Sequence, residues 1–126
     1  MSMRTPLSRT RGLGSAKEGT DHFWWQRVTA VANLILGLFT VCLMVSLVGA
    51  DYATTKAALS SPIVAIALLL FVLSASYHMK LGMQTIIEDY VHSEGRKMLL
   101  LILNIFYSVF VGLTCVFAIL KLSFGA

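Results

Sequence analysis

Three long runs of apolar residues, separated by short polar segments, dominate this chain of 126 residues. Uncharged runs cover residues 28–50, 57–79 and 98–120, and the second continues past Lys80 alone to residue 87. A helix needs about 20 apolar residues to cross the roughly 30 Å hydrocarbon core of a bilayer, so each run is long enough. Because backbone groups in lipid must be hydrogen-bonded within their own segment, we predict membrane helices at about 24–50, 61–90 and 97–122.

Polar residues mark where these helices begin and end. Residues 51–56 form the first connection, after which Ser61 can cap the second helix and Pro62 suits its first turn. Residues 88–97 form the second connection, with Gly95 as a helix breaker. Connections this short join antiparallel neighbours. The predicted fold is therefore all-α, with a three-helix transmembrane domain over residues 21–126.

The first 20 residues are polar and predict a flexible N-terminal tail. This stretch shares with mitochondrial targeting peptides its arginines and serines and the lack of an acid before Glu18. It is short, however, and contains the helix breakers Pro6 and Gly12. A secretory signal peptide is not expected, because the first apolar run is too long for one.

Composition agrees with a membrane protein, since 57% of the residues are hydrophobic and 13% are charged. Soluble domains carry about 25% charged residues, so a free-standing soluble enzyme, a disordered chain and a secreted disulfide scaffold are excluded. The two cysteines lie inside apolar runs and are expected to be packing residues.

The net charge of +4 is distributed unevenly along the chain. Basic residues gather before the first run and around the second connection: Arg4, Arg9, Arg11, Lys17, Arg27, Lys80, Arg96 and Lys97. The opposite side has only Lys56 and Lys121. By the positive-inside rule the N-terminus and the second connection face the cytoplasm, and the C-terminus lies on the far side. The uneven distribution of basic residues is therefore interpreted as a signal of membrane topology, and no nucleic-acid partner is expected.

His78 lies within the second predicted helix, where polar groups are costly and therefore informative. At about 100° per residue it shares a helix face with several positions, namely Phe71, Ser74, Gly82, Thr85 and Asp89. Gly82 has no side chain and follows one turn later, so a flat, bulky group has room beside the imidazole. This arrangement suits axial ligation of a haem whose other ligand comes from another chain. A neutral histidine hydrogen-bonded to a neighbouring helix explains the same pattern.

Three further polar residues lie where the predicted helices meet the cytoplasmic boundary. The Tyr90 hydroxyl can donate a hydrogen bond to a quinone carbonyl, with Asp89 beside it to fix its orientation. Tyrosine also populates membrane interfaces generically. Arg27 can pair with lipid phosphates or with a carboxylate such as a haem propionate.

Two segments resemble a known family, the hydrophobic membrane anchor subunit of succinate dehydrogenase, respiratory complex II, and most closely its alphaproteobacterial members. They are RTPLSRTRGLGSAKEGTDHFWWQRVTAVAN at 4–33 and YHMKLGMQTIIEDYVHSEGRK at 77–97. The more specific elements are the H-x3-G-x6-DY spacing and the upstream R-x-T-A. The third predicted helix is generic.

The resemblance implies roles for individual residues. His78 matches the position of an axial ligand to haem b, with Gly82 packing beside the haem. Tyr90, with Asp89, matches the tyrosine that hydrogen-bonds ubiquinone. Arg27 matches an arginine near the haem propionates and the quinone pocket.

The resemblance also implies partners. A second, different membrane anchor would share the helical bundle and supply the second haem histidine. The flavoprotein, with FAD, and the iron–sulfur subunit, with its clusters, would dock on the cytoplasmic side. We therefore expect an anchor in the bacterial cytoplasmic (inner) membrane, surrounded by lipid, that takes part in the tricarboxylic acid cycle and respiratory electron transfer. The mitochondrial inner membrane is the alternative location.

Two other functions remain open from the residues alone. A small oligomeric transporter should carry acidic residues within its helices, and this chain has none at membrane depth. A purely structural assembly subunit would hold no cofactor.

Overall fold

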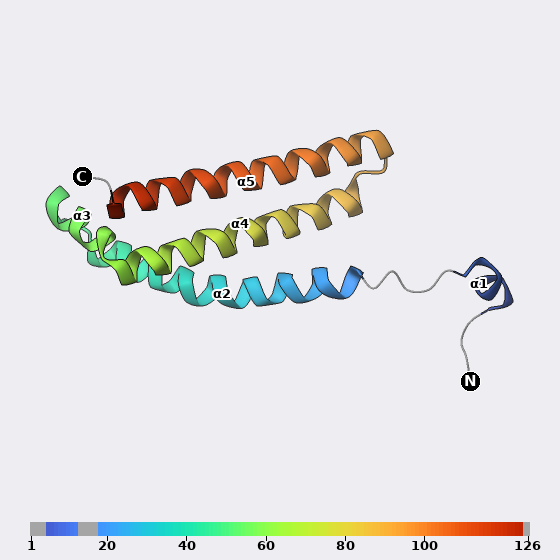
Figure 1. Ribbon diagram of the computed structural model, residues 1–126, viewed down its shortest axis with the longest axis horizontal. Helices are drawn as coiled ribbons and strands as arrows, with labels where there is room; N and C mark the ends of the chain where they lie inside the picture. Colours follow the sequence, from blue (N-terminus) through green and yellow to red (C-terminus); the bar gives the residue numbers. More distant parts are fainter. Residues whose placement is uncertain (1–4, 13–17, 125–126) are drawn as a thin grey trace.

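The computed structural model describes residues 5–12 and 18–124, and all the regular structure in this part of the chain is helical. Figure 1 shows the order of the elements. Their bounds are α1 Pro6–Arg11, α2 Glu18–Ser46, α3 Tyr52–Ser60, α4 Pro62–Tyr90 and α5 Glu94–Phe124. The all-α prediction is confirmed.

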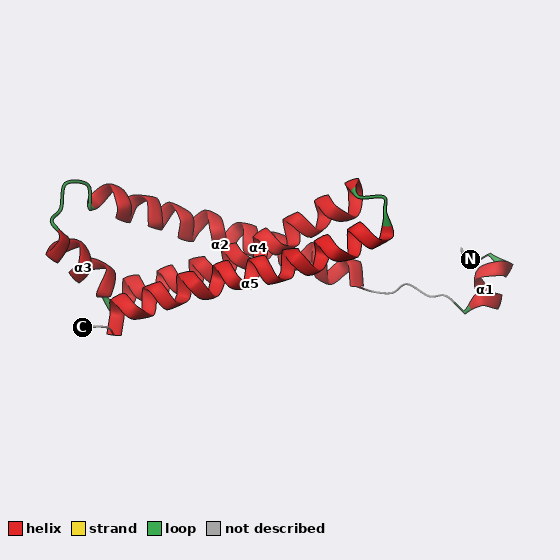
Figure 2. Ribbon diagram, turned by 90° about the horizontal axis from the view of Figure 1, so that it is seen from above, coloured by secondary structure: helices red, strands yellow, loops and turns green. Residues whose placement is uncertain are grey.

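Consecutive long helices run antiparallel (Figures 1 and 2), and α4 lies between α2 and α5 (Figure 1). Helix α4 packs against both α2 and α5, whereas α2 and α5 do not contact each other. The start of α2, the end of α4 and the start of α5 therefore lie at the same end of the molecule. Within the described ranges, three segments are long and apolar enough to span a membrane, namely Gly19–Ser46, Pro62–Tyr90 and Glu94–Phe124.

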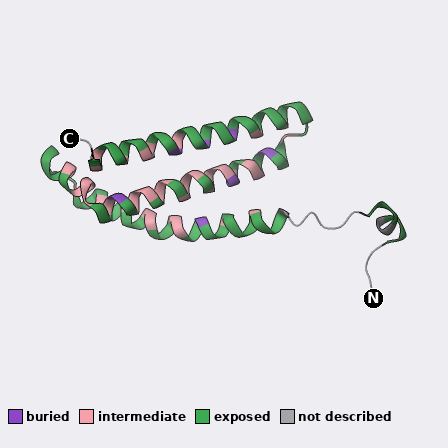
Figure 3. Cartoon of the chain, viewed as in Figure 1, coloured by how far each residue is buried: buried purple, intermediate pink, exposed green. Residues whose placement is uncertain are grey.

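The chain has almost no core of its own (Figure 3). Among the described residues, the only buried hydrophobic side chains are Ala65, Leu81 and Ile87. Large apolar side chains are exposed along the full length of α2 and α5. Exposed apolar surface on this scale must be covered by lipid or by other chains.

The first connection differs from the prediction, because it contains the short helix α3. Helix α2 ends at Ser46, before the predicted end, and the chain turns through Gly49, whose φ of 81° favours glycine. Asp51 then caps α3 by accepting a hydrogen bond from the Thr54 main-chain N–H at 3.0 Å. The pKa of Asp51 is lowered, chiefly by the Thr54 side chain and then by the Thr54 backbone.

Ser61 alone separates α3 from α4, and α4 begins at Pro62, close to the predicted start of the second membrane helix. Pro62 occupies the first turn of α4. Ser61 is at the N-cap position, but its side chain makes no capping hydrogen bond, so that part of the prediction is wrong. The Ser60 hydroxyl lies at this corner within hydrogen-bond distance of two carbonyls, that of Lys56 in α3 at 2.6 Å and that of Leu122 in α5 at 2.9 Å.

The predicted tail, residues 1–20, lies partly outside the described residues. Within the described part, α1 covers Pro6–Arg11 and α2 begins at Glu18, earlier than the predicted first helix.

Candidate functional site

The imidazole of His78 is held by a side chain from the neighbouring helix. Its Nδ1 lies 2.9 Å from Oγ1 of Thr29 in α2. Thr29 is buried, with 6% of its surface exposed. One turn before His78 on α4, the Ser74 hydroxyl donates to the Thr29 main-chain carbonyl at 3.3 Å. These two contacts fix α2 against α4 at the level of the imidazole.

The second ring nitrogen of His78 remains available. Among the described residues, none forms a hydrogen bond with Nε2 of His78. The alternative interpretation of a histidine hydrogen-bonded to a neighbouring helix therefore accounts for Nδ1 and leaves Nε2 unexplained. It does not exclude a ligand at Nε2, since the two nitrogens have separate roles.

Gly82 leaves open space on the same face of α4, one turn after His78. A Cβ built at Gly82 would meet no atom within 4 Å. By contrast, a Cβ at Gly112 would lie 3.0 Å from Oγ of Ser76, and one at Gly37 would lie 3.5 Å from the Phe71 ring. Gly37 and Gly112 thus allow close helix packing, whereas no described residue fills the space beside Gly82. A planar group beside the imidazole fits that space.

This chain offers a single histidine at the site. Among the described residues there is no group of three or more His, Cys, Asp or Glu side chains that could hold a metal ion. A single imidazole is enough for one axial ligand to a haem iron, so His78 fits that role without further metal ligands from this chain.

Tyr90 and Asp89 lie at the end of α4 and are exposed, Tyr90 with 77% of its surface. In the described part of the chain neither side chain has a hydrogen-bond partner. Both are therefore free to contact another molecule at this boundary.

Arg27 lies near the start of α2 and is also exposed. Its guanidinium stacks on Phe23, 3.3 Å from the ring centroid, and Nη1 donates to the Phe23 carbonyl at 3.4 Å. Within the described residues Arg27 forms no hydrogen bond or ion pair with His78, Asp89 or Tyr90. The structure does place Arg27 on the same helix as Thr29, two positions earlier.

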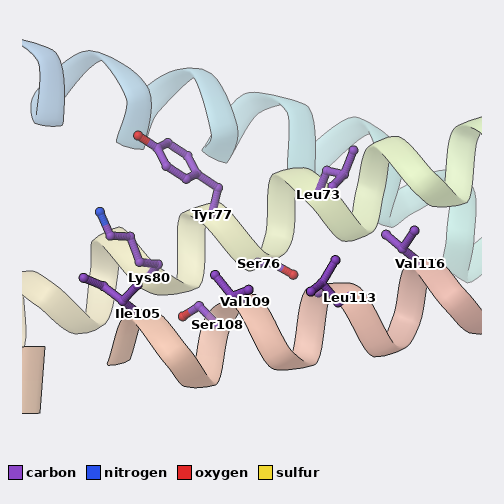
Figure 4. Close-up of a pocket in the computed structure, with 10 residues that line it drawn as sticks. Leu73, Ser76, Tyr77, Lys80, Ile105, Ser108, Val109, Leu113 and Val116 are labelled. Carbon is purple, nitrogen blue, oxygen red and sulfur yellow. The ribbon is translucent and has the colours of Figure 1, made fainter. Parts of the chain in front are cut away.

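A groove of about 370 Å³ lies between α4 and α5 (Figure 4). Its walls are mostly apolar, and Tyr77 and Lys80 extend their polar ends toward the same side of it. Tyr77 packs edge-on against Trp25 of α2, with ring centroids 6.0 Å apart. His78, Gly82, Asp89, Tyr90 and Arg27 do not line this groove, so it is separate from the candidate site.

The comparisons with known proteins decide the family. Residues 1–112 match the family model described as succinate dehydrogenase/fumarate reductase transmembrane subunit. The chain belongs to this family.

Two individual relatives are both hydrophobic membrane anchor subunits of succinate dehydrogenase. The chain is 31% identical over 106 residues to the succinate dehydrogenase hydrophobic membrane anchor subunit of Rickettsia bellii, covering 84% of this chain and 85% of the relative. It is 30% identical over 122 residues to the protein of the same name from Paracoccus denitrificans, covering 97% and 94%. No solved structure shows a significant match.

The predicted resemblance to the succinate dehydrogenase membrane anchor, of alphaproteobacterial type, is therefore confirmed. The chain is part of a succinate dehydrogenase complex and an integral membrane protein with three candidate spans. Thr29 received no role from the sequence. The one sequence feature that points to Thr29 is its position as a polar residue inside the R-x-T-A motif, at the start of an apolar run.

Proposed function

We propose that this anchor ligates haem b through His78 and forms part of the ubiquinone-reduction site with Tyr90 and Asp89. One observation carries the haem assignment. His78 is fixed through Nδ1 by Thr29, its Nε2 has no partner in the described residues, and Gly82 leaves a gap one turn away. The imidazole is thus already oriented, and the space beside it is open.

The residues of this chain would hold the haem by position and shape. His78 would supply a nitrogen ligand to the iron, Gly82 would leave room for the haem beside α4, and Arg27 would pair with a propionate. A haem with two imidazole ligands supplies a low-spin centre for one-electron transfer. A partner anchor would supply the second histidine.

The quinone role rests on the exposed end of α4. Tyr90 would donate its phenolic proton in a hydrogen bond to a quinone carbonyl, and Asp89 would help to orient it. Their exposure supports this role, because nothing in the described part of the chain occupies their hydrogen-bonding groups. Succinate would be oxidised at FAD on the flavoprotein, and the iron–sulfur subunit would carry the electrons to this boundary.

The proposed orientation places Tyr90 on the cytoplasmic side together with the start of α2 and the start of α5. Seven of the ten basic residues lie either in residues 1–27 or at Arg96 and Lys97, which favours the cytoplasmic side of a bacterial inner membrane for these ends. The flavoprotein and iron–sulfur subunits would dock on this face.

Purification of the complex through a tag on this chain, in mild detergent, tests the proposal. We expect the flavoprotein, the iron–sulfur subunit and a second small anchor to copurify, with a low-spin b-type haem in the reduced-minus-oxidised spectrum. An assembled complex without haem would overturn the haem assignment and indicate that the chain is an assembly subunit without a cofactor. Purification of the chain alone as a homo-oligomer would favour the transporter alternative.

A further inference from the structure

The hydroxyl of Thr29 makes three close contacts and has only one proton to donate. Oγ1 lies 2.7 Å from the Trp25 carbonyl, 3.2 Å from the Gln26 carbonyl and 2.9 Å from Nδ1 of His78. Both carbonyls belong to α2 itself and can only accept. A separation of 2.7 Å between two oxygens is a hydrogen bond, so the Thr29 proton is directed to Trp25.

The direction of the bond to His78 follows. Because the Thr29 proton is already committed to the Trp25 carbonyl, Oγ1 accepts in its contact with the imidazole. The proton in that contact must therefore be on Nδ1 of His78. A neutral imidazole has one N–H, so Nε2 then carries a lone pair and is the nitrogen able to bind a metal.

Thr29 is held rigidly enough to impose this choice. It is 6% exposed, and its main-chain carbonyl accepts from Ser74, one turn before His78 on α4. The backbone and the side chain of Thr29 are thus both bonded to the helix that carries the imidazole. Rotation of the ring would break the Nδ1 contact without a replacement among the described residues.

We propose that Thr29 is the positioning residue that fixes His78 as the Nδ1–H tautomer and presents its Nε2 to the haem iron. This inference rests on the proposed haem ligation by His78 and deepens it. A ligating histidine commonly donates its other N–H to an acceptor, which orients the ring and raises its basicity as a ligand. Loss of such an acceptor typically weakens metal affinity about 10- to 100-fold.

The test compares four variants of this chain in the purified complex. Thr29→Val keeps the branched shape and removes the hydroxyl, and Thr29→Ser keeps the hydroxyl. Thr40→Val is the matched control, because the half-buried Thr40 is also a threonine of α2 and its hydroxyl donates to the carbonyl four residues earlier, at 2.8 Å. Thr29→Ala removes the same hydroxyl with a smaller side chain and replaces Thr29→Val if that variant does not assemble.

Three readouts apart from activity are measured: haem transfer to an apoprotein acceptor, the haem midpoint potential, and the low-spin EPR signal. For Thr29→Val we expect haem retention to weaken about 10- to 100-fold. We also expect a higher midpoint potential, because a less basic imidazole stabilises the ferric state less, and a shifted EPR signal. Thr29→Ser and Thr40→Val should match the wild type.

The outcomes separate this inference from the proposed function. Wild-type values for haem retention, potential and EPR signal in Thr29→Val, or an equal change in Thr40→Val, would overturn the role of Thr29. If the wild-type complex holds no haem, or if His78→Ala leaves the haem unchanged, the proposed ligation fails instead.

Discussion

The side-chain amide of Asn104 in α5 donates a hydrogen bond of 2.9 Å to the main-chain carbonyl of Lys80 in α4. Asn104 is buried, with 7% of its surface exposed, and Lys80 follows His78 by two positions. On the same face of α5, at steps of four residues, lie the buried Ser108 and Gly112. This stripe of small and polar residues brings α5 close to α4, as is common between membrane helices.

Replacement of Asn104 by Leu should therefore loosen α5 from α4. Interhelical hydrogen bonds in membrane proteins contribute about 0.5 to 2 kcal/mol, and the free energy of unfolding should fall by that amount. Titration of the purified complex with a denaturing detergent measures this loss. Thr114→Val is the control, because the exposed Thr114 bonds only within α5, to Phe110. Equal stability of the Asn104 variant and this control would contradict the role given to the amide.

Replacement of Gly82 by Leu tests whether the open space on α4 is reserved for the haem. A Cβ at Gly82 meets nothing within 4 Å, so the larger side chain should leave the packing of the three helices intact. We expect an assembled complex that has lost most of its haem, measured from the pyridine haemochrome spectrum. Gly82→Ala, which adds a single methyl, is the intermediate case. Full haem content in the Leu variant would show that the haem does not lie beside Gly82.

Replacement of Tyr90 by Phe removes only the hydroxyl that is proposed to bond the quinone. Loss of one hydrogen bond of about 0.5 to 1.5 kcal/mol lowers the rate constant about 2- to 12-fold. Succinate-to-ubiquinone electron transfer should fall by this factor, while succinate-to-dye transfer should be unchanged. Tyr52→Phe serves as the matched control, since Tyr52 is similarly exposed, at 78%, but lies at the other end of the molecule. A parallel loss of both activities in the Tyr90 variant would argue against the quinone role.

The Asp51 cap should make α3 sensitive to acid. Its pKa is lowered from the usual 3.8, first by the Thr54 side chain, so the carboxylate stabilises the folded helix above pH 3.8. That stabilisation is lost as the pH falls below 3.8, through the lowered pKa of the folded state. Hydrogen exchange of residues 52–60, corrected for intrinsic rates, should show this loss in the wild type. Asp51→Ala should exchange faster at neutral pH and lack the pH-dependent step, and an identical profile in both proteins would contradict the cap.

The three membrane helices could be predicted because their signal lies in composition alone. Residues 28–50 and 98–120 carry no charge, and no other element satisfies backbone hydrogen bonds in lipid as simply as a helix. The short helix α3 was missed because its nine residues, YATTKAALS, have no apolar run and depend on the Asp51 cap. His78 was found because an imidazole within an apolar helix stands out.

The partner of His78 could not be predicted in the same way. Thr29 is 49 positions earlier in the chain, and the contact exists only because α2 and α4 pack in one particular register. A threonine that bonds the preceding turn of its own helix is ordinary, so the sequence gives no sign of the second contact. The open space at Gly82 could be predicted, because this glycine follows His78 by one turn, whereas nothing in the sequence indicates that Gly112 packs against Ser76.

The optical spectrum of the His78→Ala complex tests the central claim most directly. The control is His92→Ala, because His92 is exposed and lies in the connection between α4 and α5. We predict that His78→Ala abolishes or converts the low-spin b-type spectrum in a complex that still contains the flavoprotein and iron–sulfur subunits, and that His92→Ala leaves it unchanged. An unaltered low-spin spectrum in His78→Ala would contradict the assignment of this residue as a haem ligand.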